Sequence, residues 1–285
     1  MDDHKVTGAG AYRAGPQLPR YARLPVNHCN LPADILGSLT FQRHPVPLLL
    51  DGVQALHRTL FERLQRVDDL LTRQRWFQIH MSASFQLEHP EEAGYDAASK
   101  HPGRRKADYL RLLRGWMFDS NGREAAVLKG WVESRFGLLP RAHRGPLRDY
   151  SGEGYRAYCA ERAIGLCNTN ALEAQLDLLY CYCQFELAFA FEETPHIVLY
   201  RGANRIDEHE VVETPLPNHP ILLMNNLSSF SGSPERADEF GDAIIAARVP
   251  LSKILFFPGL LPGLLQGEDE YLVIGGLYQV ELTRL

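Results

Sequence analysis

The stretch Gly267-Glu268-Asp269-Glu270-Tyr271-Leu272-Val273-Ile274-Gly275-Gly276 joins a cluster of acidic residues to an apolar run. Residues two apart in an extended chain point to the same side, so Glu268 and Glu270 would face one space at the mouth of a strand. A buried strand has no structural need for such a pair. A solvated turn between two apolar segments would give the same pattern. The remainder of the chain has to decide between a turn and a functional site.

Composition bounds the class of protein. The chain has 285 residues, 45% of them hydrophobic, which is enough to bury the core of one large domain or two small ones. The net charge of −5 gives no general affinity for polyanions, which argues against nucleic acid as a main partner. Residues 1–5 lack the apolar region of a secretion signal, and no stretch reaches 18 apolar residues. The sequence therefore predicts a cytoplasmic protein without a membrane span.

The cysteines predict neither disulfides nor a metal site. Their number is odd and no secretion signal accompanies them, which argues against a disulfide framework. Cys181 and Cys183 would lie on different faces of a helix, and the eleven histidines show no metal-ligand spacing. We expect buried, reduced thiols and no metal.

The first two-thirds of the chain carries helical periodicity. Asp51 is a good N-cap, and apolar residues recur three and four apart after it, which predicts one long helix from residue 51 to about residue 76. Further helices are expected over residues 107–117, 123–136 and 155–191, the last with a break near residues 168–170.

The last third changes to β-strand patterns. Strands are predicted over residues 196–200, 221–224, 252–257, 271–274 and 277–282, with a short helix over residues 237–248. A run of helices followed by a run of strands is typical of an α+β protein. We divide the chain into residues 1–195, an N-terminal extension with a helical region, and residues 196–285, a β-rich core, and expect one compact unit.

Two other patterns carry weaker signals. Residues 152–157 match G-x-G-x-x-A, but no strand precedes them, and a dinucleotide fingerprint requires one. The basic segment over residues 100–106 is either a solvated surface or a dock for an acidic partner or for phosphates.

Three polar clusters in the last third are each tied to a predicted strand. They are Arg201, the serines between Ser228 and Ser231, and the pair Glu268 and Glu270. An arginine that ends an apolar strand needs a partner, because its charge is costly to bury alone. Its planar guanidinium suits a pyrophosphate or a carboxylate, and the glycine after it allows a ligand or a backbone to come close.

An arginine, a Ser-x-Ser strand and Glu-x-Glu, in this order, resemble the Arg-Ser-Glu class of mono-ADP-ribosyltransferases over residues 196–283. Leu199-Tyr200-Arg201-Gly202 is similar to the end of that family's first core strand. Over nearly the whole chain the sequence resembles the dinitrogenase reductase ADP-ribosyltransferases of nitrogen-fixing bacteria. The segments that carry this likeness are residues 27–32, 50–53, 56–64, 100–106 and 225–231.

The resemblance implies a split β-sheet sandwich that binds NAD⁺ as co-substrate, and it implies roles for particular residues. Glu270 would stabilise the positive charge of an oxocarbenium-like transition state, and Glu268 would orient the acceptor arginine. The family's usual Ser-Thr-Ser reads Ser229-Phe230-Ser231 or Ser228-Ser229-Phe230 here, and we assign the family role to Ser229. The implied NAD⁺-binding residues are Arg201, Gly202, Ser228, Ser229, Phe230 and Ser231.

Further contacts follow from the same likeness. Asn225, Asn226 and Lys106 are additional candidates to touch NAD⁺. The loop over residues 258–267, which is rich in leucine, either docks the protein acceptor or packs against the core.

The implied activity is transfer of ADP-ribose from NAD⁺ to one arginine of dinitrogenase reductase, the iron protein of nitrogenase, which switches off nitrogen fixation. The resemblance also implies a signalling partner of the PII type, and residues 51–195 are a natural place for it to dock. Two alternatives stay open. The enzyme could modify another protein or only hydrolyse NAD⁺, or the chain could be a non-catalytic NAD⁺-binding module.

Overall fold

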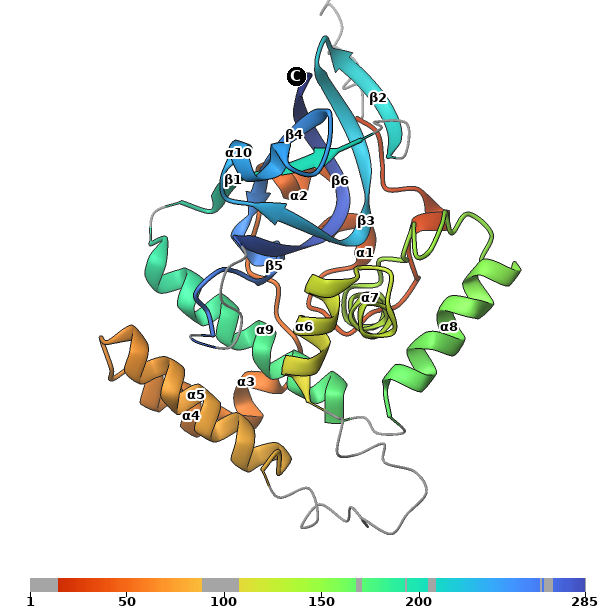
Figure 1. Ribbon diagram of the computed structural model, residues 1–285. Helices are drawn as coiled ribbons and strands as arrows, with labels where there is room; N and C mark the ends of the chain where they lie inside the picture. The colour runs from red at the N-terminus through yellow and green to blue at the C-terminus, as the bar shows by residue number, and fades with distance from the viewer. Residues whose placement is uncertain are drawn as a thin grey trace, which may run out of the picture.

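The computed structural model describes residues 15–88, 108–167, 171–192, 194–204, 209–261, 263 and 269–284. Helices make up most of the chain before residue 195, and an antiparallel sheet of six strands follows them (Figure 1). The α+β class expected from the sequence is therefore confirmed.

The helical part contains nine α-helices among the described residues. They are α1 (Ala33–Leu36), α2 (Leu39–Arg43), α3 (Val53–Leu56), α4 (Arg58–Leu64), α5 (Leu70–Phe85), α6 (Tyr109–Phe118), α7 (Arg123–Phe136), α8 (Glu153–Gly165) and α9 (Ala171–Ala190). Helices α6 and α7 match the predicted ranges closely, and the expected break between residues 155 and 191 separates α8 from α9.

The single long helix predicted from residue 51 to residue 76 is wrong. The chain forms α3, α4 and α5 there, with a turn between the last two. The side chain of Asp69 accepts a hydrogen bond from the Thr72 amide and so begins α5 as its N-cap. The Arg73 guanidinium donates to the carbonyls of Val67 and Asp68 and holds the turn. A capping residue within an apolar period thus began a new helix.

The strands are β1 (His196–Ala203), β2 (Glu210–Leu216), β3 (His219–Ser231), β4 (Ala243–Pro250), β5 (Ile254–Phe256) and β6 (Glu270–Arg284). Their order is β2-β3-β1-β4-β6-β5, and β3 also pairs with β6, so β3, β1, β4 and β6 pair in a ring. Strand β6 pairs with β3 along one edge, and along the other edge first with β5 and then with β4. The expected split sheet is thus one continuous, strongly curved sheet with β6 shared between its halves (Figure 1).

The helix predicted over residues 237–248 is wrong. A short helix, α10 (Pro234–Asp238), comes first, and residues 243–250 form β4. Strand β4 pairs with β1 on one side and with β6 on the other, and most of its residues are buried. Backbone pairing on both edges outweighed the weak helical preference of a short alanine-rich segment.

The two strands predicted over residues 271–274 and 277–282 form one strand, β6. Gly275 and Gly276 lie inside it instead of forming a turn. A Cβ atom on Gly275 would lie 1.9 Å from the Asn225 carbonyl oxygen, and Gly276 has a φ of +114° against Gly37. Both positions require glycine for packing.

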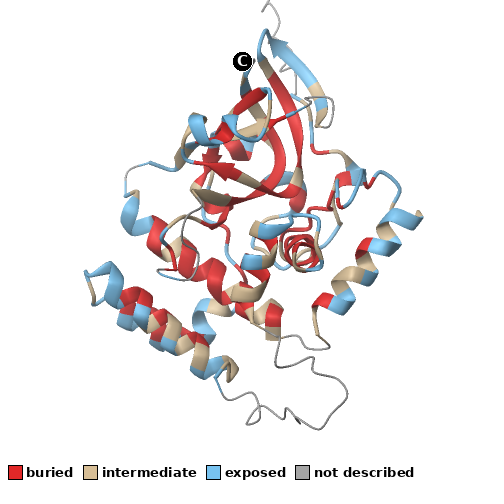
Figure 2. Ribbon diagram, in the orientation of Figure 1, coloured by how far each residue is buried: buried red, intermediate tan, exposed pale blue. Residues whose placement is uncertain are grey.

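The buried core spans the helical part and the sheet. Figure 2 shows buried residues concentrated on α7, on α9 and on the strands, and one continuous hydrophobic cluster reaches from Leu18 to Val280. At its centre, the Lys253 ammonium donates to the Gly275 carbonyl over 2.7 Å and lies near the rings of Phe41 and Tyr278.

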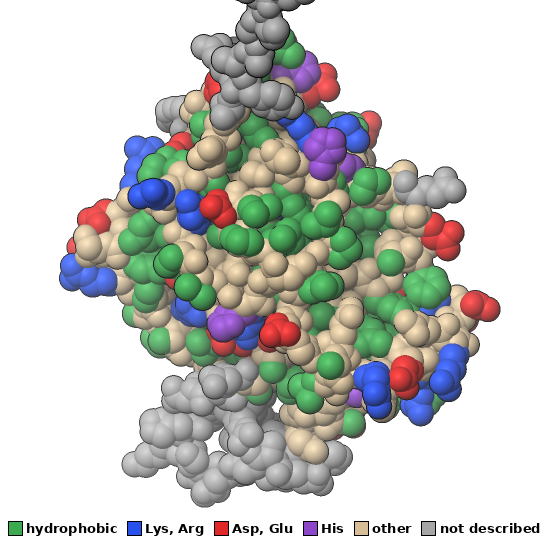
Figure 3. All heavy atoms as spheres, turned by 180° about the vertical axis from the view of Figure 1, so that it is seen from behind, with side chains coloured by type: hydrophobic (Ala, Val, Ile, Leu, Met, Phe, Trp, Pro, Cys, Tyr) green, Lys and Arg blue, Asp and Glu red, His purple; other side chains and the backbone are tan. Residues whose placement is uncertain are grey.

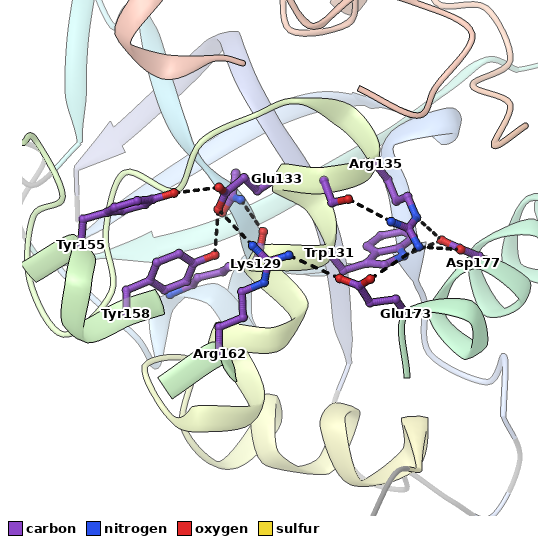
Figure 4. A network of polar contacts seen from close by, with 11 residues as sticks. Lys129, Trp131, Glu133, Arg135, Tyr155, Tyr158, Arg162, Glu173 and Asp177 are labelled. Carbon is purple, nitrogen blue, oxygen red and sulfur yellow. Dashed lines mark hydrogen bonds and ion pairs between the residues drawn. The ribbon is translucent and has the colours of Figure 1, made fainter. Parts of the chain in front are cut away.

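A polar network joins α7, α8 and α9 (Figure 4). Glu133 accepts hydrogen bonds from the hydroxyls of Tyr155 and Tyr158. Arg162 lies 3.9 Å from Glu133 and 3.3 Å from Glu173, so that one guanidinium bridges two helices. These contacts fix the three helices relative to one another.

The surface agrees with the weak overall charge. On the face seen in Figure 3, side chains of both signs are interspersed, and the described residues form no continuous basic area there. Within the described ranges, no helix is both long and apolar enough to cross a membrane.

Candidate active site

A cavity of about 600 Å³ lies between the end of α6 and the sheet. It brings together at least one residue from each of the three polar clusters that the sequence singled out, together with residues from α6 and α10. Its lining consists of residues 116–120, Tyr200, Arg201, Gly202, Ser229, Phe230, Ser231, Arg236, Ala237, Phe240, Asp269 and Glu270.

Strand register explains why these residues meet. Tyr200 of β1 pairs with Ser231 of β3, and Ser231 pairs in turn with Glu270, the first residue of β6. The polar ends of three strands therefore lie side by side at one edge of the curved sheet. Residues far apart in the chain share this edge because β3 pairs with both β1 and β6.

Glu270 is held by hydrogen bonds. The Ser229 hydroxyl donates to Glu270 Oε1, and the indole nitrogen of Trp116 donates to the same oxygen over 3.0 Å. The Trp116 nitrogen also lies 2.9 Å from Ser229 Oγ. Arg201 Nη1 donates to the Ser229 carbonyl over 2.8 Å. A carboxylate, a hydroxyl, an indole and a guanidinium thus form one connected group on the cavity wall.

The charge of Arg201 acts on two neighbouring basic residues. Burial, and after it the charge of Arg201, lowers the pKa of Lys129 to about 7 and that of His209 to about 4. Both neighbours therefore shed positive charge more readily than in water. Arg201 is therefore a positive charge on the cavity wall that suits an anionic ligand group, and Asp119, Asp269 and Glu270 are acidic residues of the same lining.

The serines of β3 differ in position. Ser229 and Ser231 lie two apart and both line the cavity, whereas Ser228 is buried and does not line it. Ser231 Oγ donates to Asp269 over 3.2 Å, and the Gly232 amide donates to the same carboxylate oxygen over 2.9 Å. Asp269, only a spacer in the sequence pattern, joins the start of β6 to the end of β3.

Gly202 is required for packing. A Cβ atom there would lie 2.0 Å from the carbonyl oxygen of Ala237 in α10. Phe230, also on the cavity wall, is buried. The short distance to α10 explains this glycine without any ligand.

Several predicted positions lie outside the described residues. Glu268 is one of them, and so is the whole basic segment over residues 100–106, including Lys106. In the loop that precedes Glu268, Leu260 and Leu261 are buried in the core, and Gln74 of α5 donates to the Gly259 carbonyl over 2.5 Å. The described part of this loop therefore packs against the helical part.

Asn225 and Asn226 serve the fold. The Asn226 amide donates to the carbonyls of Lys129 and Leu138, and Asn225 Oδ1 accepts from the Arg141 amide. Neither asparagine lines the cavity. They hold β3 to the helical part, and the structure gives them no place against a ligand in this cavity.

The expectation that the thiols are buried holds for only part of the set. All five cysteines are free, and Cys181 and Cys183 are buried, whereas Cys29, Cys159 and Cys167 are partly exposed. Burial raises the pKa of the Cys181 thiol to about 12, so it stays protonated. No group of three or more metal-binding side chains occurs among the residues that the structure describes.

Sequence reasoning missed Trp116 and the exposed aromatic rings at the cavity mouth. Phe118 is 94% exposed and Phe240 is 68% exposed. Trp116 follows Tyr109, Leu112 and Leu113 at helical spacing, so it resembles an ordinary core residue in the sequence. An apolar stripe cannot show which of its members carries a hydrogen bond into a site.

Comparison with known proteins shows the family of this chain. The family model for dinitrogenase reductase ADP-ribosyltransferase (DRAT) matches residues 26–282. A relative from Rhodospirillum rubrum, NAD(+)--dinitrogen-reductase ADP-D-ribosyltransferase, is 42% identical over 262 residues, which cover 91% of this chain and 95% of the relative. No solved structure matches the chain. The chain therefore belongs to the dinitrogenase reductase ADP-ribosyltransferase family.

Proposed function

We propose that this protein transfers ADP-ribose from NAD⁺ to one arginine of dinitrogenase reductase and releases nicotinamide. The observation that carries the proposal is the placement of Glu270, bonded by Ser229 and beside Arg201, on the wall of a cavity. Membership of the family and the name of the Rhodospirillum rubrum relative support the substrate pair.

The residues around the cavity fit NAD⁺ as substrate. The Arg201 guanidinium supplies a fixed positive charge for the pyrophosphate or the nicotinamide ribose. Ser229 holds Glu270 and offers a hydroxyl on the wall where the ribose would lie. Phe230 and Ser231 complete this wall, while Ser228 supports it from the buried side. NAD⁺ is the co-substrate, and we assign no metal to the reaction.

The chemistry follows from a carboxylate near a sugar carbon. The bond between the ribose and nicotinamide breaks, its electron pair leaves with nicotinamide, and positive charge develops on the ribose. The Glu270 carboxylate stabilises this charge. A nitrogen of the target arginine forms the new bond to the ribose carbon and loses a proton.

We assign the acceptor side of the reaction to Glu268. A guanidinium is always protonated and is a poor nucleophile in water. A second carboxylate two residues from Glu270 would orient the guanidinium and accept its proton in the transition state. The spacing in the sequence and the family resemblance support this assignment. A PII-type regulator and a cytoplasmic location stay predictions.

The experiment is mass spectrometry of purified dinitrogenase reductase after incubation with this protein and NAD⁺. We expect one added ADP-ribose on a single arginine, located by peptide mapping. A target variant with that arginine changed to lysine serves as control and should stay unmodified.

Other results would separate the alternatives. Release of nicotinamide without modification of the target would favour NAD⁺ hydrolysis. A modified protein of different mass in a cell extract would favour another target. If no NAD⁺ is consumed, the remaining hypothesis is a non-catalytic NAD⁺-binding module.

A further inference from the structure

We infer that Trp116 is a positioning residue whose indole N–H holds Ser229 and Glu270 in the geometry that the reaction requires. The inference rests on the proposed function and adds to it a residue from the helical part of the chain. Trp116 lies on α6, more than a hundred residues before β3, and it is 2% exposed.

The donors and acceptors of Trp116, Ser229 and Glu270 are consistent with one fixed arrangement of hydrogen bonds. A serine hydroxyl has one hydrogen and two lone pairs. When Ser229 gives its hydrogen to Glu270, its oxygen can still accept from the indole nitrogen 2.9 Å away. The same N–H lies 3.0 Å from Glu270 Oε1 and is therefore shared between two acceptors.

The indole hydrogen bond is compatible with the ionised form of the carboxyl group. An indole nitrogen donates and never accepts. Its contact with Glu270 Oε1 is therefore satisfied when this oxygen is an acceptor, as both oxygens of an ionised carboxylate are. The ionised carboxylate is the form that stabilises positive charge on the ribose, so the Trp116 hydrogen bond is compatible with the reactive state.

The surroundings of Trp116 keep the indole in place. The Tyr109 amide at the start of α6 donates to the Gln175 side chain over 2.8 Å, which fixes the helix to α9. Near Trp116, a Cβ atom on Gly115 would lie 2.4 Å from Glu124, so α6 and α7 meet there at close range. The Lys129 ammonium lies 5.7 Å from the centroid of the Trp116 ring. The donor therefore has a rigid support that is independent of the sheet.

The chain offers a matched control in Trp131. Its ring is fully buried on α7, and its indole nitrogen donates to the Asp177 carboxylate over 2.7 Å. Trp131 does not line the cavity. Both tryptophans are thus buried and bonded to a carboxylate, but only Trp116 is bonded to the proposed catalytic one.

The experiment compares Trp116→Phe with Trp131→Phe in the full chain. Nicotinamide release from NAD⁺ and transfer to a small guanidine acceptor are both followed, together with thermal unfolding. Loss of a hydrogen bond to a charged group corresponds to a fall in kcat of about 10- to 100-fold, and we expect this loss for Trp116→Phe. The KM for NAD⁺ should change less than about threefold. Trp131→Phe should keep kcat close to wild type even where it lowers Tm.

A second replacement separates the N–H from the shape of the ring. In 3-benzothienylalanine at position 116 a sulfur takes the place of the indole N–H, and the bicyclic ring is kept. We expect the same loss of kcat with a Tm close to wild type. Equal losses of kcat in Trp116→Phe and Trp131→Phe, or full activity of the benzothienylalanine protein, would overturn the inference while leaving the proposed function intact. A wild-type protein that neither binds nor cleaves NAD⁺ would overturn the proposed function, and the role of Trp116 with it.

Discussion

Strand β3 carries two polar clusters that look alike in the sequence and do different work. Asn225 and Asn226 in its middle bond to backbone groups of the helical part, whereas Ser229 and Ser231 at its end bond to carboxylates on the cavity wall. Both clusters interrupt an apolar strand. The difference teaches how to separate the two kinds of polar residue in a strand. A residue whose hydrogen-bond partners are backbone groups is structural. A residue whose partners are ionisable side chains at a cavity is a functional candidate.

The largest effect is expected for Glu270→Gln, because Glu270 is the carboxylate to which Ser229 of β3 donates. The amide keeps the size of the side chain but removes the charge that stabilises the developing cation. Nicotinamide release should fall by about 100- to 1,000-fold, comparable with the loss of one preorganised stabilising group in other enzymes. Steady-state kinetics and a thermal melt on the same preparation check this. Full transferase activity in a folded Glu270→Gln protein would contradict the mechanism.

Changes to the structural pair, Asn225 and Asn226, should instead lower the free energy of unfolding. Asn226 is 1% exposed, and its amide serves the carbonyls of Lys129 and Leu138. Asn226→Ala leaves these carbonyls without that donor and should lower the free energy of unfolding by about 2–3 kcal/mol. The partly exposed Asn225 is the control, and its replacement by alanine should cost about 1 kcal/mol. Urea unfolding gives both values. A loss of kcat in Asn226→Ala without a loss of stability would break the comparison.

Ser229→Ala, at the functional end of β3, should have a moderate effect on kcat. It removes the hydroxyl that donates to Glu270 and leaves the carboxylate in place. The expected loss is about tenfold in kcat, which corresponds to one hydrogen bond of about 1.4 kcal/mol in the transition state. Ser252, buried far from the cavity lining, provides Ser252→Ala as the control. A larger loss in Ser228→Ala than in Ser229→Ala would reverse the assignment of the family role.

The effect that is smallest within any single pH unit concerns the stability of the fold around Lys253. Burial lowers the pKa of Lys253, whose ammonium donates to Gly275 opposite Asn225, to about 7. Between pH 7 and about 10 the unfolded chain keeps this proton while the folded chain loses it, so stability rises with pH by up to about 1.4 kcal/mol per unit.

Lys253→Met should abolish this contribution. The difference in the free energy of unfolding between wild type and variant, measured by urea unfolding at several pH values, should therefore grow from pH 7 upwards. Lys129 is present in both proteins and cancels in the difference. A constant difference across this range would show that Lys253 titrates normally.

Some residues were recognisable before the fold was known and others were not. Arg201, Ser229 and Glu270 stood out because they are charged or polar side chains at the ends of apolar strands, and they meet at one cavity. Trp116 was hidden in the apolar stripe of α6, and its function depends on a contact across 113 residues. Glu268 lies outside the described residues, and its role, like the division of the chain at residue 195, stays a prediction.

By itself, the sequence determined the α+β class, the positions of α6 and α7 and the polar ends of the strands, because hydrophobic period, caps and breakers act locally. Only the tertiary structure decided that residues 243–250 form a strand and that Gly275 and Gly276 lie inside one. It also decided that Gly202 makes room for α10 and that an indole from the helical part reaches Glu270. These features depend on pairing and packing between distant segments, and local preference carries no information about such contacts.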